Sequence, residues 1–555
     1  MSSIKIERMS QTINCLLHHH SLLQSNFGAI RPRFYTTNQT INPLQTHHLD
    51  PYTYTSGRWL RHDKIQIDSR YIEFDFDALC RRVIELSPGA TSIATYDKKE
   101  GGFNRVFIFT TDNGKTVVAR LPFAFAGPPS LTTNSEVATI RYLQTNTSVP
   151  IPKILDWSDD PSNAIGSEYI IMERAAGTQL HQKWPTMAIG QKIRCRDAIY
   201  RKLKEVVRIT FPAYGSIYFA DSSLDSTSKP TSKRPLDQDF SVGPHCSSRY
   251  WDCNVGESRY YHNTKPNQGP WDDLTTYCDG LVDIGMSRIP PVNPVPDNLR
   301  RYHGSVSTHL RLLEFGRAVI NNMCKDHRIR DAAAPTLFHP DLHKRNIFVS
   351  DDDPTIITSI IDWQSASIEA AFWYADEVPD FAMTLPHPSL ETQLEPNSEY
   401  CAKAFKVATQ FHLPKLARPR VMDESLFRPF RYCYRTWKDG VVAFRHELDK
   451  TSKWWQELGL VGSCPYPVPT AEELAVHQKE YKYFEAAHDL RNHVTGLLNT
   501  AFDDWVPAEE WETAKLANKE LFGMMLETVL SIENPDDDEP LKDEGDVREI
   551  WPFEM

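Results

Sequence analysis

The sequence predicts an α+β fold with two lobes: a small antiparallel β lobe that carries one main helix, and a larger lobe that is mostly helical. Three observations predict it. Short strand and turn patterns follow one another between residues 102 and 172, with one helical pattern among them. Two short apolar strands flank an acidic turn near residue 350. Helical patterns dominate from about Tyr400 onward.

The β lobe is expected over residues 70–175. An apolar run at 102–109 follows a pair of glycines, Asp112-Asn113-Gly114 is typical of a hairpin turn, and 116–121 is the expected return strand. The remaining elements expected in this lobe are two helices, at 74–86 and 135–144, and two short strands, at 150–157 and 168–172.

The larger lobe is expected over residues 176–555. It should contain an insertion at 221–304, which is rich in Ser, Pro, Asn, Tyr and Trp. Within the insertion we expect disorder at 221–246, whereas the aromatic part at 250–280 should pack on the lobe. That part could shape a substrate pocket or could serve only surface packing. Further helices of this lobe are expected at 306–323, 471–486 and 508–532.

Composition limits the classes of function. The 555 residues are 40% hydrophobic and 24% charged, and no apolar run of about 18 residues predicts a membrane-spanning helix. The formal net charge of -12 disfavours nucleic acid as the main partner, because phosphate backbones require clustered Lys and Arg. A nucleotide needs only a few local cations. The ten cysteines form no Cys-x-x-Cys pair, which predicts free thiols in a reducing compartment.

The first 35 residues have the composition of a mitochondrial transit peptide. They contain four basic residues and one acidic residue, and 13–23 can form an amphipathic helix. Arg33 lies two positions before Tyr35, as in a matrix-protease cleavage context. An ordinary disordered tail is the alternative. Residues 36–69 are polar without strong periodicity and are interpreted as a linker.

The segment 338–363 carries the candidate chemistry. Asp341 and Asn346 stand five apart before one apolar strand, and Asp362 ends the next one. Transfer of a phosphoryl group requires neutralisation of the nucleotide charge, usually by Mg²⁺, which favours hard oxygen ligands. We therefore expect Asn346 and Asp362 to hold Mg²⁺, and Asp341 to orient and deprotonate the hydroxyl that accepts the phosphoryl group.

This segment resembles the signature of the aminoglycoside phosphotransferase and choline kinase superfamily, relatives of the protein kinases. The shared pattern is His-x-Asp-Leu-His-x-x-Asn at 339–346, followed by Ile361-Asp362-Trp363. The resemblance implies a protein-kinase-like fold, ATP and Mg²⁺ as cofactors, and transfer of the γ-phosphate to a hydroxyl of a small molecule. Trp363-Gln364 stands where protein kinases have Phe-Gly, which points to the small-molecule branch.

Further features resemble a narrower fungal mitochondrial group, the one represented by altered inheritance of mitochondria protein 9. They are the basic leader, the Gly-Gly-Phe-Asn turn, the Val-Ala-Arg strand, the aromatic insertion and His339-Pro340-Asp341-Leu342-His343. This resemblance implies a mitochondrial location. The partners that the superfamily resemblance implies are a nucleotide triphosphate and an unknown small-molecule acceptor.

The superfamily resemblance also implies which residues contact the nucleotide. A Gly turn between the first two strands would cover the phosphates, a Glu on the main helix would pair with a strand cation, and the connection between the lobes would contact adenine. The residues at these positions are Gly101, Gly102, Phe103, Asn104, Arg120, Glu136, Met172 and Glu173. Arg120 is a departure, because kinases have Lys there and Arg is not geometrically equivalent.

Two other functions stay open. Arg120 and the large insertion motivate a non-catalytic nucleotide-binding scaffold. A protein kinase is disfavoured, since no Asp-Phe-Gly to Ala-Pro-Glu segment follows Asp362. The acceptor cannot be identified from the sequence. Acidic residues could meet a cationic acceptor, although solvated surface is the favoured interpretation of them; they are Glu369, Asp376, Glu377 and Asp380.

Overall fold

The computed structural model describes most of the chain after residue 49. The described residues are 50–221, 233–251, 255–256, 260, 265–291, 299–375, 377–383, 398–501, 503–532 and 541–555. The predicted transit peptide lies outside them, as does the first part of the predicted linker.

The small lobe is built on a five-stranded antiparallel sheet in the order β2-β3-β4-β6-β5. Its strands are β2 Ile93–Glu100, β3 Asn104–Thr111, β4 Thr116–Pro122, β5 Ile154–Ser158 and β6 Tyr169–Glu173. The expected hairpin forms between β3 and β4, and helix α3 (Phe76–Glu85) lies where it was predicted. The sequence did not predict β2, because this edge strand is half-exposed and rich in charged residues.

The main helix of this lobe, α4 (Leu131–Asn146), is longer and more deeply buried than predicted. Its N-terminal turn is held by Glu168, which accepts hydrogen bonds from Ser130 N and Thr133 Oγ1 at 2.7 and 2.5 Å. Its polar residues are buried as well as its apolar ones, because β8 (Ser216–Phe219), just before the insertion, packs against the helix as β5 and β6 also do. This position carries Glu136 into the interior.

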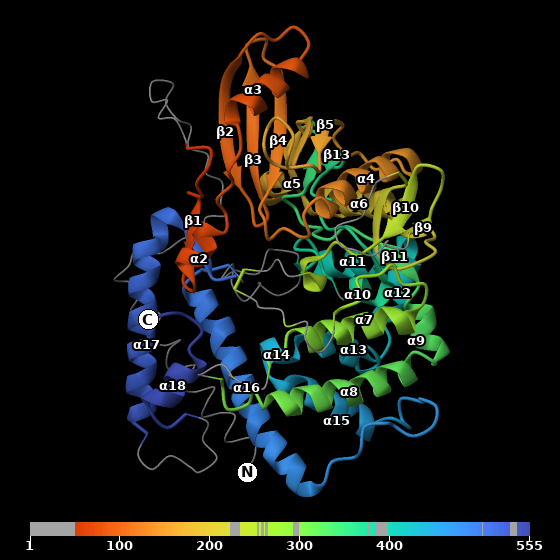
Figure 1. Cartoon of the computed structure of the whole chain (residues 1–555), viewed down its shortest axis with the longest axis vertical. Coiled ribbons are helices and arrows are strands. Elements are labelled where there is room, and N and C mark those ends of the chain that lie inside the picture. The colour runs from red at the N-terminus through yellow and green to blue at the C-terminus, as the bar shows by residue number, and fades with distance from the viewer. Residues whose placement is uncertain are drawn as a thin grey trace.

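The larger lobe is mostly helical, as predicted (Figure 1). Helix α8 spans the predicted range to the residue. The helices are α5 Leu180–Lys183, α6 Ile189–Arg208, α7 Leu274–Ser287, α8 Val306–Met323, α9 His327–Ala332, α10 Ala371–Ala375, α11 Ser398–His412, α12 Pro414–Arg420, α13 Arg428–Tyr432, α14 Thr436–Asp439, α15 Val441–Lys453, α16 Ala471–Leu497, α17 Trp511–Leu530 and α18 Glu544–Ile550. Two small sheets lie beside them: β7 Thr178–Gln179 with β12 Ile347–Val349 and β13 Ile357–Ile360, and β11 Pro335–Leu337 with β14 Ile368–Ala370.

The insertion is folded to a greater extent than predicted. The expectation of disorder is wrong for 233–246, where β9 (Arg234–Pro235) and β10 (Phe240–Gly243) form a sheet with β8 (Ser216–Phe219). Phe240 and Val242 are buried in the core that contains α4, which explains the order. Residues 222–232 lie outside the described part.

The aromatic part of the insertion belongs to the interior of the larger lobe. Tyr250, Trp271 and Tyr277 are each at most 1% exposed and pack with α7 and α8. The predicted packing on the lobe is therefore confirmed. Because these three side chains are almost fully buried, they belong to the core of the lobe and not to its surface.

Residues 50–69 are folded, so the prediction of a linker is wrong for this stretch. Strand β1 (Gly57–Trp59) pairs antiparallel with β15 (Trp505–Pro507), and helix α2 (Asp63–Asp68) follows it. Trp59 is 1% exposed. Figure 1 shows β1 and α2 between the sheet of the small lobe and the C-terminal helices α16 and α17. The stretch lacks periodicity because its order comes from contacts with distant parts of the chain.

Two predictions about the chain as a whole are met within the described residues. None of the helices described is long and apolar enough to cross a membrane. The eight cysteines of the described part are free thiols.

Candidate active site

The hairpin of β12 and β13 brings the three predicted catalytic and metal-binding residues together. Asp341 and Asn346 precede β12, and Asp362 follows β13 by two positions. Ile347 pairs with Ile360, and the N–H of Ile361 donates to the Asn346 carbonyl at 2.9 Å. The backbone of Asn346 therefore lies directly against the residue before Asp362.

His339 connects the two ends of this hairpin and was not among the predicted site residues. Its ring is fully buried; Nδ1 accepts from the N–H of Asp341 at 3.1 Å, and Nε2 lies 2.8 Å from the carbonyl of Ile361. These partners require the neutral tautomer protonated on Nε2. Burial lowers the pKa of His339, which agrees with a neutral ring. The signal in the sequence was the motif itself, whose histidine precedes Asp341 by two residues.

The Asp341 carboxylate is partly exposed and is paired with His343. Asp341 Oδ2 lies 3.2 Å from His343 Nε2, and Asn346 Nδ2 donates to the Asp341 carbonyl at 3.0 Å. Burial acts to raise the pKa of Asp341, but the hydrogen bond and charge of His343 outweigh it and hold that pKa below its ordinary value. The carboxylate is therefore ionised at neutral pH, as a group that accepts a proton must be.

Arg120 joins the two lobes at the site. From β4 its Nη1 donates to Glu136 of α4, and its Nη2 donates to Oδ1 of Asp362 at 2.9 Å. Burial disfavours the charged guanidinium, but the two carboxylates more than compensate and keep its pKa raised. The fork of Arg serves both acids with separate nitrogens, which the single ammonium of Lys cannot do in the same way. The predicted pairing of Arg120 with Glu136 is present.

The Gly turn between β2 and β3 is open on one side and held on the other. The N–H of Gly101 donates to the Asn104 carbonyl at 2.9 Å, and Phe103 is 52% exposed. A Cβ placed on Gly102 would meet no atom within 4 Å. The side chain of Asn104 turns inward and donates to Gln364 Oε1 at 2.6 Å. In the sequence, Gln364 stands out only as a departure from the kinase pattern.

Met172 and Glu173 end β6, immediately before the connection to β7 in the larger lobe. Met172 is buried in the core beside α4, and Glu173 is exposed. The N–H of Glu173 donates to the Lys153 carbonyl at 2.9 Å. This N–H is consequently engaged, so it is not a free donor for a base.

The donors near Asp362 suit a hard cation. Asn346 uses its amide nitrogen on Asp341, which leaves its side-chain oxygen as an acceptor. The Asp362 side chain is 38% exposed, and its backbone has a φ of 68°, a left-handed value that is uncommon outside Gly. Among the described residues no group of three or more His, Cys, Asp or Glu side chains has the arrangement of a metal site. One carboxylate and one amide oxygen would require further oxygen ligands from phosphate and water.

The prediction that the acidic residues after the motif are solvated surface is wrong for Glu369. This side chain is buried and contacts His245 Nε2 at 2.9 Å, Tyr277 Oη at 2.5 Å and Arg249 Nη2 at 3.2 Å. Burial alone would raise its pKa, but His245 and Arg249 lower that pKa to about 2. All three partners come from the insertion. Glu377 and Asp380 are exposed, and Asp376 lies outside the described residues.

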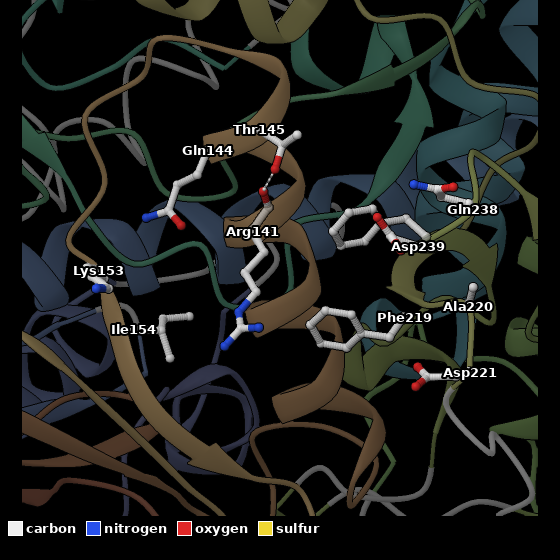
Figure 2. A pocket seen from close by; sticks show the side chains of 11 residues that line it. Arg141, Gln144, Thr145, Lys153, Ile154, Phe219, Ala220, Asp221, Gln238 and Asp239 are labelled. Atoms are coloured by element: carbon white, nitrogen blue, oxygen red, sulfur yellow. Dashed lines mark hydrogen bonds between the residues drawn. The ribbon is translucent and has the colours of Figure 1, made fainter. Parts of the chain in front are cut away.

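A cavity of about 900 Å³ lies apart from these residues, between the C-terminal half of α4, β5 and the sheet of β8, β9 and β10. Figure 2 shows Arg141 extending from α4 toward Phe219, whose ring centroid is 5.8 Å from the guanidinium carbon. None of the predicted site residues lines this cavity. Its lining consists of Arg141, Gln144, Thr145, Lys153, Ile154, Phe219, Ala220, Asp221, Gln238, Asp239 and Phe240.

Comparison with known sequences finds relatives in fungi, whereas no family model matches the chain. A subtelomeric hrmA-associated cluster protein of Aspergillus fumigatus is 27% identical over 482 residues, covering 76% of this chain and 91% of that protein. Altered inheritance of mitochondria protein 9, mitochondrial, is 25% identical in Yarrowia lipolytica, over 43% of this chain and 44% of that protein. The Candida albicans protein of that name is 22% identical, over 62% and 65%. The predicted resemblance to this group is confirmed.

Comparison with solved structures finds phosphotransferases at low similarity. A putative aminoglycoside phosphotransferase from Ralstonia eutropha has a TM-score of 0.37 and 14% identity, covering 75% of this chain and 97% of that one. A putative fructosamine-3-kinase from Thermobifida fusca has a TM-score of 0.31 and 13% identity, covering 67% and 99%. The assignment of a two-lobed kinase-like fold rests on the strand order β2-β3-β4-β6-β5 and the place of α4 in this chain.

Proposed function

We propose that the chain is an ATP-dependent phosphotransferase, a small-molecule kinase that transfers the γ-phosphate to a hydroxyl of an acceptor. One observation carries the proposal. His339 binds the backbone beside Asp341 with one ring nitrogen and the backbone beside Asp362 with the other. A candidate base and a candidate metal ligand are thereby held in fixed relation, as a reaction that depends on positioning requires.

Asp341 is the catalytic residue in this proposal. Its carboxylate accepts the proton of the acceptor hydroxyl as the oxygen attacks the γ-phosphorus, and the bond from that phosphorus to the β-phosphate oxygen breaks. The depressed pKa of Asp341 keeps the carboxylate available at neutral pH. Oδ2 of this carboxylate lies 3.2 Å from His343 Nε2 and accepts from Asn346 Nδ2 at 3.4 Å, and the two contacts limit its movement.

Asn346 and Asp362 would hold Mg²⁺. A bound Mg²⁺ would neutralise phosphate charge and orient the nucleotide. On the nucleotide side, we assign the turn Gly101, Gly102, Phe103 and Asn104 to the phosphates. We assign the end of β6, Met172 and Glu173, to the base, with the Glu173 N–H excluded as a donor because the Lys153 carbonyl engages it. Arg120 supplies positive charge and is itself fixed by Glu136.

We further propose that the protein acts in mitochondria. The basic, acid-poor first 35 residues support this location. So do the relatives from several yeasts that are named as mitochondrial proteins. Cell fractionation with a C-terminal tag tests it, and recovery of the full-length chain in the cytosol alone would contradict it.

The proposed activity is tested by Mg²⁺-dependent ATP binding and hydrolysis, measured for the protein from residue 36 onward and for Asp362→Ala. The matched control is Asp352→Ala, which removes an exposed carboxylate from the turn between β12 and β13. We expect binding and slow hydrolysis in the wild type, loss of both in Asp362→Ala, and no change in the control. A folded wild type that binds no nucleotide would contradict the proposal.

A specific contact also favours the second candidate, a nucleotide-binding scaffold without catalysis. Arg120 lies 2.9 Å from Asp362 and so engages a carboxylate that Mg²⁺ would need. In that case nucleotide would bind without Mg²⁺ dependence. Asp341→Asn would leave the affinity unchanged, and neither protein would turn over ATP.

A further inference from the structure

Glu100 is the last residue of β2 and directly precedes the Gly turn. Its side chain is fully buried, as is that of Arg105 on β3, and the side chain of Lys98 is only 3% exposed. Glu100 Oε1 lies 3.2 Å from Lys98 Nζ and 3.4 Å from Arg105 Nη2. Burial lowers the pKa of both cations. Charges withdrawn from water in this way persist only with good partners.

The partners come from residues 50–70, a segment that we call the N-terminal brace. Glu100 Oε2 accepts from Thr55 N at 2.8 Å, from Ser56 N at 2.9 Å and from Ser56 Oγ at 2.8 Å. The two cations donate to five backbone carbonyls of the brace at 2.6 to 3.0 Å, those of Asp50, Pro51, Tyr52, Thr53 and Arg70. Donors of the brace meet the carboxylate, and its acceptors meet the cations.

The other side of the brace is bound to the C-terminal part of the chain. The carbonyl of Ser56 accepts from Ala508 N at 3.2 Å, directly after β1 and β15 pair. Trp505 Nε1 donates to the hydroxyl of Tyr54 at 2.8 Å. Figure 1 shows the brace, with β1 and α2, between the β lobe and α16. The backbone of Ser56 thus links the two sides, because its N–H donates to Glu100 and its carbonyl accepts from Ala508.

The Gly turn is therefore held at both ends. Glu100 fixes the end of β2, and the bond between Asn104 and Gln364 fixes the start of β3 against the catalytic segment. Between these points the Phe103 carbonyl accepts from Phe123 N at 2.9 Å, whereas the Phe103 side chain is half-exposed and a Cβ on Gly102 would meet open space. The Gly101 N–H is engaged by the Asn104 carbonyl, so the N–H groups that a turn with fixed ends can present to an anion, without a large ordering cost, are those of Gly102 and Phe103.

We propose that Glu100 is a positioning residue that, through the N-terminal brace, sets the Gly101–Asn104 turn for binding nucleotide phosphates. The inference rests on the proposed phosphotransferase function. It goes beyond the kinase motifs, because neither Glu100 nor residues 50–70 belong to them.

The test compares Glu100→Gln with Asp97→Asn. Asp97 is an exposed acid on the same strand, so the control makes the same chemical change three residues away. The first readout is amide hydrogen exchange of residues 101–103 in the nucleotide-free protein. The second is KM for ATP against kcat. We expect Glu100→Gln to speed exchange in the turn and to raise KM by about fivefold with kcat within about twofold. Glu100→Asp should restore part of both effects.

If Glu100→Gln does not fold, the same two measurements are made on Ser56→Ala. This variant is milder, because it removes only the hydrogen bond from the Ser56 hydroxyl to Glu100. Unchanged exchange at 101–103 in a folded variant would overturn the proposal, as would a fall in kcat with KM unaltered. The experiment distinguishes failure of the Glu100 proposal from failure of the proposed phosphotransferase function. Faster exchange in the turn of a protein that never binds ATP supports the anchoring of the turn, overturns its role toward phosphate and contradicts the proposed function.

Discussion

The side chains of Asn104 and Gln364 meet at 2.6 Å although 260 positions separate them. One residue begins β3 in the small lobe and the other follows Asp362 in the larger lobe. Both are buried, at 9% exposure. This contact makes the position of the Gly turn depend on the segment that carries the candidate metal ligand.

A double-mutant cycle of Asn104→Ala and Gln364→Ala should reveal that dependence. We expect a coupling energy of about 1 kcal/mol in urea unfolding, because one buried hydrogen bond is shared. Each single variant should also weaken nucleotide binding. Additive effects of the two substitutions on stability would contradict the expected coupling.

Substitution of His339 should disturb both ends of the catalytic hairpin at once. His339→Phe keeps the ring beside Trp363 but leaves Asp341 N and the Ile361 carbonyl without their partner. We expect a loss of about 1–3 kcal/mol in the free energy of unfolding and roughly a 100-fold loss of turnover. His327→Phe on an exposed helix start is the control, with a change within about 0.5 kcal/mol.

Arg120→Lys should move stability and metal binding in opposite directions. One ammonium cannot keep both ion pairs, so the free energy of unfolding should fall by about 1–3 kcal/mol. Asp362 would at the same time be released, and the apparent affinity for Mg²⁺ in the presence of ATP should rise. Calorimetry measures both quantities. Arg208→Lys, at the exposed end of α6, is the control and should change neither.

The pair of Asp341 and His343 predicts a pH dependence. Burial alone would lower the pKa of His343, but the hydrogen bond and charge of Asp341 raise it above 6.5. The contact therefore stabilises the fold fully below pH 6.5, down to the acid range in which Asp341 is protonated, and loses that effect as pH rises through the raised pKa of His343. NMR titration of the His343 ring measures it. Asp341→Asn should bring the pKa of His343 below 6.5, whereas Asp352→Asn should leave the titration as in the wild type.

Glu369 should contribute to resistance against acid. Its pKa of about 2 lies below the ordinary 4.5, so its stabilisation is present above pH 4.5 and disappears as pH falls toward 2. Glu369→Gln should cost about 3–5 kcal/mol in urea unfolding at pH 7, because it takes the carboxylate away from buried His245 and from partly buried Arg249. The difference from wild type should shrink by pH 3. An exposed control, Glu399→Gln, should behave as wild type.

The parts of the fold that sequence predicts well are those specified by neighbours in the chain. The catalytic hairpin could be predicted because Asp341, Asn346 and Asp362 lie within 25 residues and are separated by two short apolar strands. Helix α8 could be predicted because Ser305 caps it and its apolar residues recur at helical spacing.

The parts that sequence misses are those specified by distant partners. β2 contains Asp97, Lys98 and Lys99, and three charged residues in a row suggest a solvated segment. Only the structure shows that Lys98 donates to a carbonyl of the distant N-terminal brace. Glu369 belongs to the interior only because the insertion supplies its three partners. Hydrophobic periodicity over a short stretch of sequence cannot predict either the contact of Lys98 or that of Glu369.

The pairing of β1 with β15 has a consequence for the order of events during synthesis. Tyr54 and Trp505, which hydrogen-bond beside this pair, are separated by 451 positions. A ribosome therefore completes the whole β lobe long before it makes the strand that secures the brace. Contacts of such large sequence separation form late and slowly. A nascent or truncated chain can thus contain every residue of the catalytic motif while the brace still lacks its partner strand, so the brace is secured only after residue 507 has been made.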